Sequence, residues 1–408
     1  MKQFNIQSYI YVKVKSNTSF FDIKFFPQKN TQNEDIFAIT GNKMVIIAKT
    51  DGNKISILST YYDLNEKENL CCCTWSIEKN TNKPLLCVAG ASGVIKVIDI
   101  YSGKILKSLK GHGDEILDIK VSPINSSIIA TASFDHTVRV WSLMEENTIQ
   151  PTLVLCGGEG GHEDRVLTIA FHHSAQYIVS GGMDNSVKMW AIPNFSKTDT
   201  SKISYRSKDN MISLPYPHFS TTAIHTNYVD CVEFYGDLIF SKSAEEGRII
   251  LWKIIGFDSN KDPPHPECAP TAHEWSETRS SFGNGLQKLL QFMIFDCNPW
   301  YMRFAIWNSY TENRFQTFLA IGNLKAKIFI WEISETLEYK DAYTLIKPNV
   351  ILTIPKSSIT IRQLSINRDG TCLIAVGSMG NYLLLVLLLT QKLIRLIHSF
   401  DYKYSFFL

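Results

Sequence analysis

The stretch "GHGDEILDIKVSPINSSIIATASFDHTVRVWSL" covers Gly111–Leu143, and "GHEDRVLTIAFHHSAQYIVSGGMDNSVKMWAI" covers Gly161–Ile192. Each begins with Gly-His and ends in the pattern Asp-x-x-Val-x-apolar-Trp, and the histidine precedes the tryptophan by 29 and 28 residues, respectively. In a looser copy, "HTNYVDCVEFYGDLIFSKSAEEGRIILWKI", His225 precedes Trp252 by 27 residues. Self-similarity at a nearly fixed spacing predicts a repeat architecture.

Within each copy, short alternating runs rich in Val and Ile are bounded by Gly, Ser, Asp and Asn. This pattern is typical of strands joined by tight turns, and no segment has the length and periodicity of a helix. Weaker copies cover residues 20–60, 68–108, 295–333 and the stretch from Ser358. The copies resemble the WD repeat, whose units form four-stranded blades of a β-propeller. We therefore expect an all-β, seven-bladed WD-repeat propeller, although six or eight blades also fit the pattern.

Two polar stretches rich in Ser or Pro, 193–222 and 256–285, interrupt the repeat. We expect both to be inter-blade insertions that run over the surface as solvated loops.

The two ends of the chain depart from the repeat. We expect residues 1–19 to form an N-terminal segment, 20–389 the propeller and 390–408 an atypical tail. After Asn381 the chain reads "YLLLVLLL" where a WD unit ends in a strand with Trp. This run can supply outer strands of the last blade and pair with the N-terminal "YIYVKV" to close the ring and cover a sheet edge. A mistranslated end of the gene is the alternative.

Composition excludes several classes of function. The 408 residues are 45% hydrophobic, and 41 basic against 39 acidic residues leave a net charge of +2, with no footprint for sequence-specific nucleic-acid or membrane binding. The nine cysteines have irregular spacing without CxxC pairs, which favours reduced thiols and no metal site. There is no cleavable signal pattern, and the longest apolar run, Tyr382–Leu389, is short of the roughly 20 residues of a membrane span. We expect a soluble intracellular protein without a cofactor.

In WD repeats a histidine, a Ser or Thr, a turn Asp and the strand Trp form a buried hydrogen-bonded set. The resemblance implies two such sets here: His112, Ser133, Asp135 and Trp141, and His162, Ser180, Asp184 and Trp190. A histidine beside an aspartate and a serine also suggests a catalytic triad. Because enzymes do not usually repeat their active site at a fixed spacing, we interpret both sets as structural.

Aligning the residue that opens the first strand of each copy gives a column of seven positions. They are Phe21, Cys71, Leu117, Leu167, Asp230, Trp300 and Arg362, with Tyr301 one position further on. Aromatic rings grouped at the mouth of a channel are a candidate cage for a methylated ammonium group. The alternative is that these rings only plug the end of the channel.

Five stretches together resemble one family: "PYPHFSTTAIHTNYVDCVEFYGDLIFSKSAE" (215–245), "PWYMRFAIW" (299–307), "GHEDRVL" (161–167), "ENLCCCTW" (68–75) and "SITIRQLSINRDGTCLIAV" (358–376). They are similar, in order over roughly residues 20–380, to the Polycomb group family called EED in animals, or Extra sex combs. The resemblance implies a nuclear, non-catalytic subunit of Polycomb repressive complex 2, a histone H3 lysine methyltransferase that acts in gene silencing. It implies three kinds of partner: the catalytic subunit of the Enhancer of zeste type, other Polycomb subunits, and histone tails bearing trimethyl-lysine.

By the same resemblance, the trimethyl-lysine cage comprises Phe21, Cys71, Trp300 and Tyr301, and the peptide path is lined by Arg303 and Arg362. Met302 and Phe304 follow the core alternation, whereas the resemblance implies that Trp300 and Tyr301 lie at the binding surface.

The family has a tyrosine where this chain has Cys71, in an alignment fixed by Trp75. One cation–π contact contributes about 0.5–2 kcal/mol, so its loss predicts about 3- to 30-fold weaker binding of trimethyl-lysine. The competing hypothesis is that the scaffold role is kept and methyl-lysine recognition is lost.

Two other classes of function compete with this interpretation. A generic propeller adaptor would not share the 215–245 and 299–307 stretches. An enzyme would need a phosphate-cradling loop, a metal-ligand spacing or a nucleophile elbow, and the sequence has none; the Gly-rich run Gly157–Gly161 precedes a strand and reads as a turn. We therefore expect a protein without catalytic activity.

Overall fold

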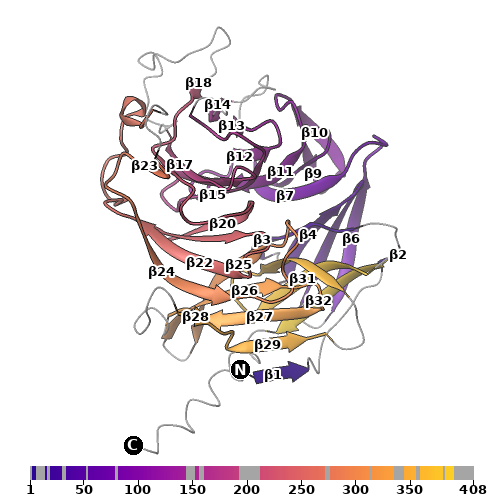
Figure 1. The fold of residues 1–408 in the computed structure, drawn as a ribbon. Coiled ribbons are helices and arrows are strands. Elements are labelled where there is room, and N and C mark those ends of the chain that lie inside the picture. The colour runs from indigo at the N-terminus through magenta and orange to yellow at the C-terminus, as the bar shows by residue number, and fades with distance from the viewer. Residues whose placement is uncertain are drawn as a thin grey trace, which may run out of the picture. The chain divides into compact units, whose positions relative to one another are not determined.

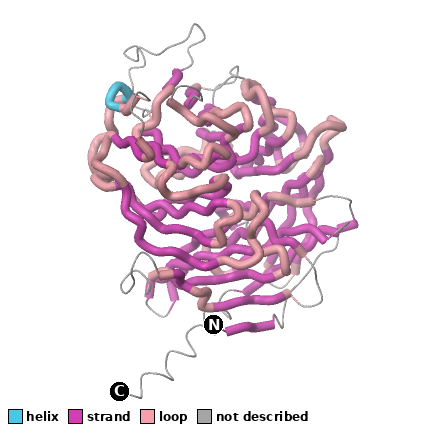
Figure 2. Tube along the Cα trace, in the orientation of Figure 1, coloured by secondary structure: helices cyan, strands magenta, loops and turns pink. Residues whose placement is uncertain are grey.

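The computed structural model describes residues 2–5, 14–15, 19–29, 34–51, 54–78, 81–143, 152–155, 160–192, 212–271, 276–311, 314–334, 344–354, 359–379 and 382–389. The chain forms two compact units. The first comprises Met1–Tyr62, Phe292–Cys297 and Tyr301–Leu408, and the second comprises Asp63–Gln291 and Asn298–Trp300. Within the described ranges the chain consists of strands and loops, apart from one 3₁₀ turn, η2 (Pro266–Cys268) (Figure 2). The all-β prediction is confirmed.

The first unit contains three sheets in the described residues, each built from strands in hairpin succession (Figure 1). One consists of β3 (Asp22–Lys29), β4 (Asp35–Gly41), β5 (Met44–Thr50) and β6 (Ile55–Tyr62). The next consists of β25 (Phe304–Thr311), β26 (Arg314–Gly322), β27 (Lys327–Glu332) and β29 (Val350–Thr353), with β1 (Lys2–Asn5) parallel to β29. The last consists of β30 (Thr360–Ile366), β31 (Cys372–Met379), β32 (Tyr382–Leu389) and β2 (Val14–Lys15). A short strand, β28 (Leu345–Ile346), also belongs to this unit.

The second unit contains four sheets in its described part. The first consists of β7 (Leu70–Ile77), β8 (Pro84–Gly90), β9 (Ile95–Asp99) and β10 (Lys104–Leu109). The second consists of β11 (Ile116–Val121), β12 (Ile128–Ser133), β13 (Val138–Ser142), β14 (Leu153–Leu155) and β18 (Ile212–Leu214). The third consists of β15 (Val166–Phe171), β16 (Tyr177–Gly182), β17 (Val187–Ala191), β19 (Phe219–Thr221) and β23 (Thr278–Ser280). The fourth consists of β20 (Val229–Tyr235), β21 (Leu238–Ser243), β22 (Arg248–Ile254) and β24 (Leu286–Met293), of which residues 286–291 lie in this unit.

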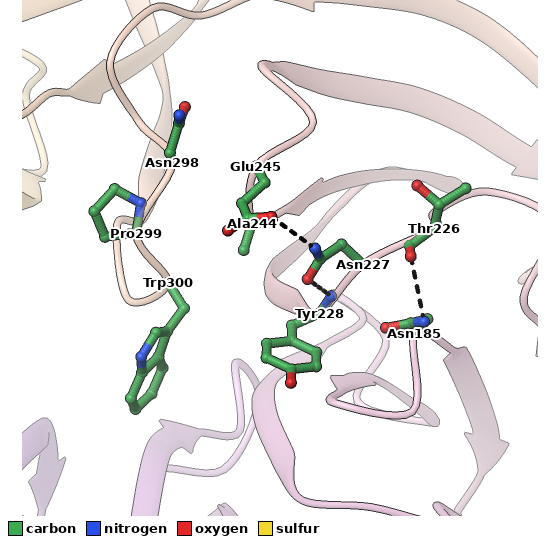
Figure 3. A pocket seen from close by; sticks show the side chains of 9 residues that line it. All are labelled: Asn185, Thr226, Asn227, Tyr228, Ala244, Glu245, Asn298, Pro299 and Trp300. Atoms are coloured by element: carbon green, nitrogen blue, oxygen red, sulfur yellow. Dashed lines mark hydrogen bonds between the residues drawn. The ribbon is translucent and has the colours of Figure 1, made fainter.

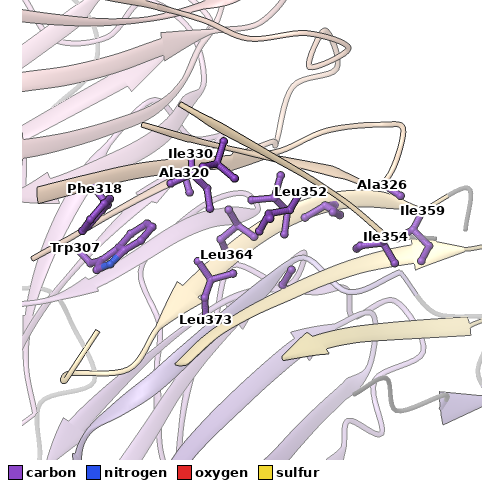
Figure 4. Close-up of a cluster of buried hydrophobic side chains, with 14 residues drawn as sticks. Trp307, Phe318, Ala320, Ala326, Ile330, Leu352, Ile354, Ile359, Leu364 and Leu373 are labelled. Carbon is purple, nitrogen blue, oxygen red and sulfur yellow. The ribbon is translucent and has the colours of Figure 1, made fainter. Parts of the chain in front are cut away.

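Buried apolar side chains form a core between successive sheets within each unit. In the first unit, Trp307 stacks on Phe318 with ring centroids 5.3 Å apart, beside Leu364 and Leu373 of the next sheet (Figure 4). Burial of one such side chain contributes about 1.5–3 kcal/mol. The alternation of Val, Ile and Leu along the strands therefore provides the main stabilisation of each pair of sheets.

The two polar stretches that interrupt the repeat are not simply solvated loops. Residues 193–211 lie outside the described residues, but β19 at the end of the first stretch is the fourth strand of its sheet. From the second stretch, Phe257 packs edge-on against Tyr177 at 5.0 Å and against Phe282 at 5.2 Å. The expectation of loops only was wrong because a few apolar residues in a polar segment are enough to add a strand or cover a core.

Candidate functional site

In five of the sheets formed by the described residues, the first strand has a β-bulge near its start. The residue passed over by the register shift is Cys71, Leu117, Leu167, Asp230 or Arg362. A bulge inserts one unpaired residue and redirects its side chain. These five positions belong to the column that the sequence alignment singled out, so the column has a common local structure.

The first histidine set forms a continuous chain of hydrogen bonds. Trp141 Nε1 donates to Thr131 Oγ1 at 2.8 Å, the Thr131 hydroxyl lies 2.7 Å from His112 Nε2, and His112 Nδ1 lies 2.8 Å from Asp135 Oδ2. With a neutral imidazole, the threonine donates to Nε2 while Nδ1–H donates to the carboxylate.

Thr131 therefore takes the place in this set that was predicted for Ser133, and that prediction was wrong. Ser133 Oγ donates instead to the carbonyl of Asp114 at 3.1 Å. The register explains the difference: Thr131 pairs with Arg139, two residues before the tryptophan, as Ser180 pairs with Lys188 in the next repeat.

The second set has the predicted members: His162 Nε2 lies 2.7 Å from Ser180 Oγ, and its Nδ1 lies 2.9 Å from Asp184 Oδ2. In the described part of the chain, Trp190 Nε1 has no hydrogen-bond partner.

A third set, which the sequence analysis did not assign, lies in the looser copy. His225 Nε2 lies 2.7 Å from Ser241 Oγ, which also accepts from Trp252 Nε1 at 2.9 Å, and His225 Nδ1 lies 2.8 Å from Glu246 Oε2. The glutamate in place of an aspartate hid this set, although the spacing from His225 to Trp252 was a signal for it.

The electrostatics of the sets suit a structural role. Burial lowers the pKa of His112, His162 and His225, which keeps each ring neutral. Burial alone would raise the pKa of Glu246, but the hydrogen bonds that it accepts from His225 and Thr226 outweigh burial and lower this pKa to about 2. All three imidazoles are nearly inaccessible to solvent, so none of them can act on a substrate.

Four of the six residues predicted to form the cage and the peptide path lie together in the first unit. The Phe21 and Tyr301 rings meet edge-to-face at 5.5 Å, and the guanidinium carbons of Arg303 and Arg362 lie 4.7 Å above Tyr301 and 5.5 Å above Phe21. Arg303 N also donates to Arg362 O at 2.9 Å. Both ring faces thus already carry a cation, as expected for rings whose quadrupoles favour positive charge.

The burial of the segment around Tyr301 is uneven. Met302 and Phe304 are buried, as the core prediction for these two residues required. Tyr301 is only 5% exposed, and its backbone has a φ of +66°, which is uncommon for an aromatic residue. Trp300 in the second unit is 38% exposed and thus available to a ligand.

The other two predicted cage residues differ in the second unit. Cys71 is 3% exposed, and its Sγ donates to the carbonyl of Ile116 at 3.0 Å, so the thiol does not stand at the surface. The Trp300 ring lies 6.3 Å from the ring of Phe134, with 37° between the planes. Phe134 was not predicted as a site residue.

Trp300 also lines a cavity of about 400 Å³ (Figure 3). Trp300 and Tyr228 contribute exposed aromatic rings to it, and the Glu245 carboxylate accepts from Asn227 Nδ2 at 3.2 Å. Its remaining lining residues are Asn185, Thr226, Ala244, Asn298 and Pro299. The cavity offers aromatic faces and hydrogen-bonding groups next to the predicted cage tryptophan, as a peptide-binding surface requires.

Two features relevant to other functions are absent from the described residues. No group of three or more His, Cys, Asp or Glu side chains could hold a metal ion there. Nor does this part of the chain include a helix of the length and hydrophobicity needed to cross a membrane.

Comparison with known proteins identifies similar repeats and similar whole chains. The family model "WD domain, G-beta repeat" matches residues 103–142 and 153–191. Polycomb protein EED of Chaetomium thermophilum is 37% identical over 337 residues, which cover 78% of this chain and 57% of that protein. Polycomb group protein FIE1 of Oryza sativa subsp. japonica is 30% identical over 352 residues, which cover 85% of this chain and 83% of that protein. The chain thus spans little more than half of the length of the Chaetomium relative.

Solved structures of the polycomb repressive complex 2 contain a chain that is similar to this one over most of its length. A chain in the crystal structure of the Chaetomium thermophilum polycomb repressive complex 2 superposes with a TM-score of 0.82 at 29% identity, covering 92% of this chain and 96% of that chain. The same values hold for a structure of the Chaetomium complex with H3K27me3.

Proposed function

Because this chain belongs to the Polycomb EED and Extra sex combs family, we propose that it is a non-catalytic WD-repeat subunit of a Polycomb repressive complex 2-type histone methyltransferase. The observation that carries this proposal is the similarity over 92% of the chain to a chain of solved complexes of this type. As such a subunit it acts in the nucleus, in gene silencing, and binds an Enhancer of zeste-type catalytic subunit and other Polycomb subunits. The buried histidine sets support a scaffold role, since their imidazoles stabilise the sheets and are inaccessible to a substrate.

The full propeller is proposed to have seven blades over residues 20–389. The seven sheets of the described residues support this number. The N-terminal segment 1–19 contributes β2, which pairs with β32 through Val14 and Leu383, and we propose that this pair closes the ring. The tail 390–408 lies outside the described residues.

The subunit is further proposed to recognise trimethyl-lysine on the histone H3 tail through Phe21, Trp300 and Tyr301, with Arg303 and Arg362 along the peptide path. The edge-to-face contact of Phe21 with Tyr301 and the exposure of Trp300 support this assignment. A solved structure of the Chaetomium polycomb repressive complex 2 with H3K27me3 and H3K27M supports the choice of ligand.

The burial of Cys71 favours a second candidate, a scaffold without methyl-lysine recognition. Titration of the purified protein with H3 peptides, trimethylated and unmodified, separates the two. Recognition requires a preference of tenfold or more for the trimethylated peptide that Trp300→Ala abolishes. Equal binding of the two peptides would leave only the scaffold function, which co-purification with the catalytic subunit then tests independently.

A further inference from the structure

We propose that Phe134 is an aromatic wall of the trimethyl-lysine site and takes over the role that a ring at position 71 would have. This inference rests on the proposed recognition of trimethyl-lysine. It assigns that function to a residue pair of the second unit, Phe134 and Trp300.

The first support is the position of Phe134 relative to Cys71. The backbone N–H of Phe134 donates to the carbonyl of Glu115 at 2.9 Å, and Cys71 Sγ donates to the carbonyl of Ile116 at 3.0 Å. The two carbonyls belong to consecutive residues. Residues 71 and 134 are therefore both hydrogen-bonded to the start of β11. The ring of Phe134 can thus line the surface above the buried thiol of Cys71.

The second support is the distance between the rings. The centroids of Phe134 and Trp300 are 6.3 Å apart, and their planes are inclined by 37°. A cation–π contact needs the cation within about 6 Å of a ring centroid. One ammonium group can thus contact both rings at once, in the angle that the two planes enclose.

The third support is that Phe134 already binds a cation. The guanidinium carbon of Arg165, an exposed residue, lies 4.4 Å from the centroid of the Phe134 ring. A ring face that attracts an arginine of its own chain is accessible to charge and has the right polarity for a methylated ammonium. Arg165 consequently competes with the ligand and must move aside or share the ring.

The fourth support is rigidity. Phe134 directly precedes Asp135, whose carboxylate is fixed by His112 and by the backbone N–H of Gly113 at 3.0 Å. A preorganised ring loses little conformational freedom when the ligand binds. The structural histidine set of this repeat therefore holds the binding residue in place.

The test measures affinities for two H3 peptides, one trimethylated and one in which a neutral tert-butyl group replaces the trimethylammonium. Phe134→Leu retains the apolar bulk and removes the ring. It should weaken binding of the trimethylated peptide by about 3- to 30-fold and leave the neutral peptide nearly unaffected. Phe134→Tyr, which keeps an aromatic ring at this position, should retain the preference for the charged peptide that Phe134→Leu loses.

Two further variants complete the design. Arg165→Gln removes the competing cation and should strengthen binding of the trimethylated peptide by about 2- to 5-fold. Met183→Leu is the matched control, because Met183 precedes Asp184 in the next repeat as Phe134 precedes Asp135. It should change neither affinity. Since Arg165 is exposed, its variant keeps the test usable if Phe134→Leu folds poorly.

The possible results distinguish this inference from the function on which it rests. If the wild type does not prefer the trimethylated peptide to the unmodified one, the proposed recognition itself fails. If the wild type has the preference and Trp300→Ala removes it, while Phe134→Leu and Arg165→Gln leave it unchanged, recognition stands and the role of Phe134 is refuted.

Discussion

The hydroxyl of Thr131 connects two buried groups, and its removal should destabilise the protein strongly. Thr131→Val keeps the shape of the side chain but leaves both Trp141 Nε1 and His112 Nε2 without their partner, at sites that are fully buried. An orphaned buried polar group costs about 1–3 kcal/mol. The free energy of unfolding should therefore fall by about 2–6 kcal/mol.

Two serines provide the comparison. Ser180→Ala deprives only one group, the His162 imidazole, of a hydrogen-bond partner, because Trp190 Nε1 has none in the wild type. The free energy of unfolding should therefore fall by about 1–3 kcal/mol. Ser133→Ala should cost about 1 kcal/mol, since the two groups that lose a partner, the carbonyl of the exposed Asp114 and the backbone N–H of the partly exposed Asp135, can bond to water instead.

Urea unfolding followed by tryptophan fluorescence and by circular dichroism measures these losses, and coincident curves would license a two-state treatment. The predicted order is Thr131→Val, then Ser180→Ala, then Ser133→Ala. A loss for Ser133→Ala as large as that for Thr131→Val would refute the assignment of the hydrogen-bonded set.

Other predictions concern the second unit. Lys242 donates to Asp230 at 2.8 Å with both side chains buried, so Lys242→Met should cost about 3–5 kcal/mol, whereas adding Asp230→Leu should restore much of it; urea midpoints measure both. Burial lowers the pKa of His218 in the folded protein to about 4, whereas its value in the unfolded chain is near 6.5. The folded state therefore has its full stability above pH 6.5 and loses stability as the pH falls toward 4, because only the unfolded chain is protonated in that range. Between pH 7 and 5 this amounts to about 2 kcal/mol, and His218→Gln should reduce the pH dependence of unfolding by that amount. Phe257→Ala should lower stability by about 2 kcal/mol because the ring packs on the core, whereas the exposed control Lys261→Ala should have almost no effect in thermal unfolding.

The repeats could be predicted because a histidine set requires particular residue types at nearly fixed spacing. Only one hydroxyl can stand between His112 and Trp141, however, and two candidates, Thr131 and Ser133, lie two residues apart on the same face of a strand. Comparison with the next repeat separates them, because Thr131 precedes Trp141 by 10 residues and Asp135 by 4, as Ser180 precedes Trp190 and Asp184. The strand register thus decided between two residues that composition left equivalent.

The outer strands were harder to predict than the inner ones. Strands β18 and β19 have three residues each, and β19 lies at the end of a polar stretch. Three residues are too few for an alternation pattern to be recognised. Whether these residues form a strand depends on the hydrogen bonds that they make with a neighbouring strand. Those bonds exist only in the folded sheet and cannot be read from the sequence of the segment.

For the candidate site, an alignment of the repeats finds some of the residues and misses others. The bulge residues form a column because each repeats the same local geometry, so an alignment of repeats finds them, Cys71 included. Phe134 comes from a turn between the second and third strands of its sheet, and the corresponding residue of the next repeat is Met183. Nothing in the repeat pattern connects that turn with position 71; the connection is a pair of hydrogen bonds to the consecutive carbonyls of residues 115 and 116. In the proposed site, the ring that is missing at position 71 is therefore supplied by a turn of the next sheet, a position that an alignment of the repeats does not include.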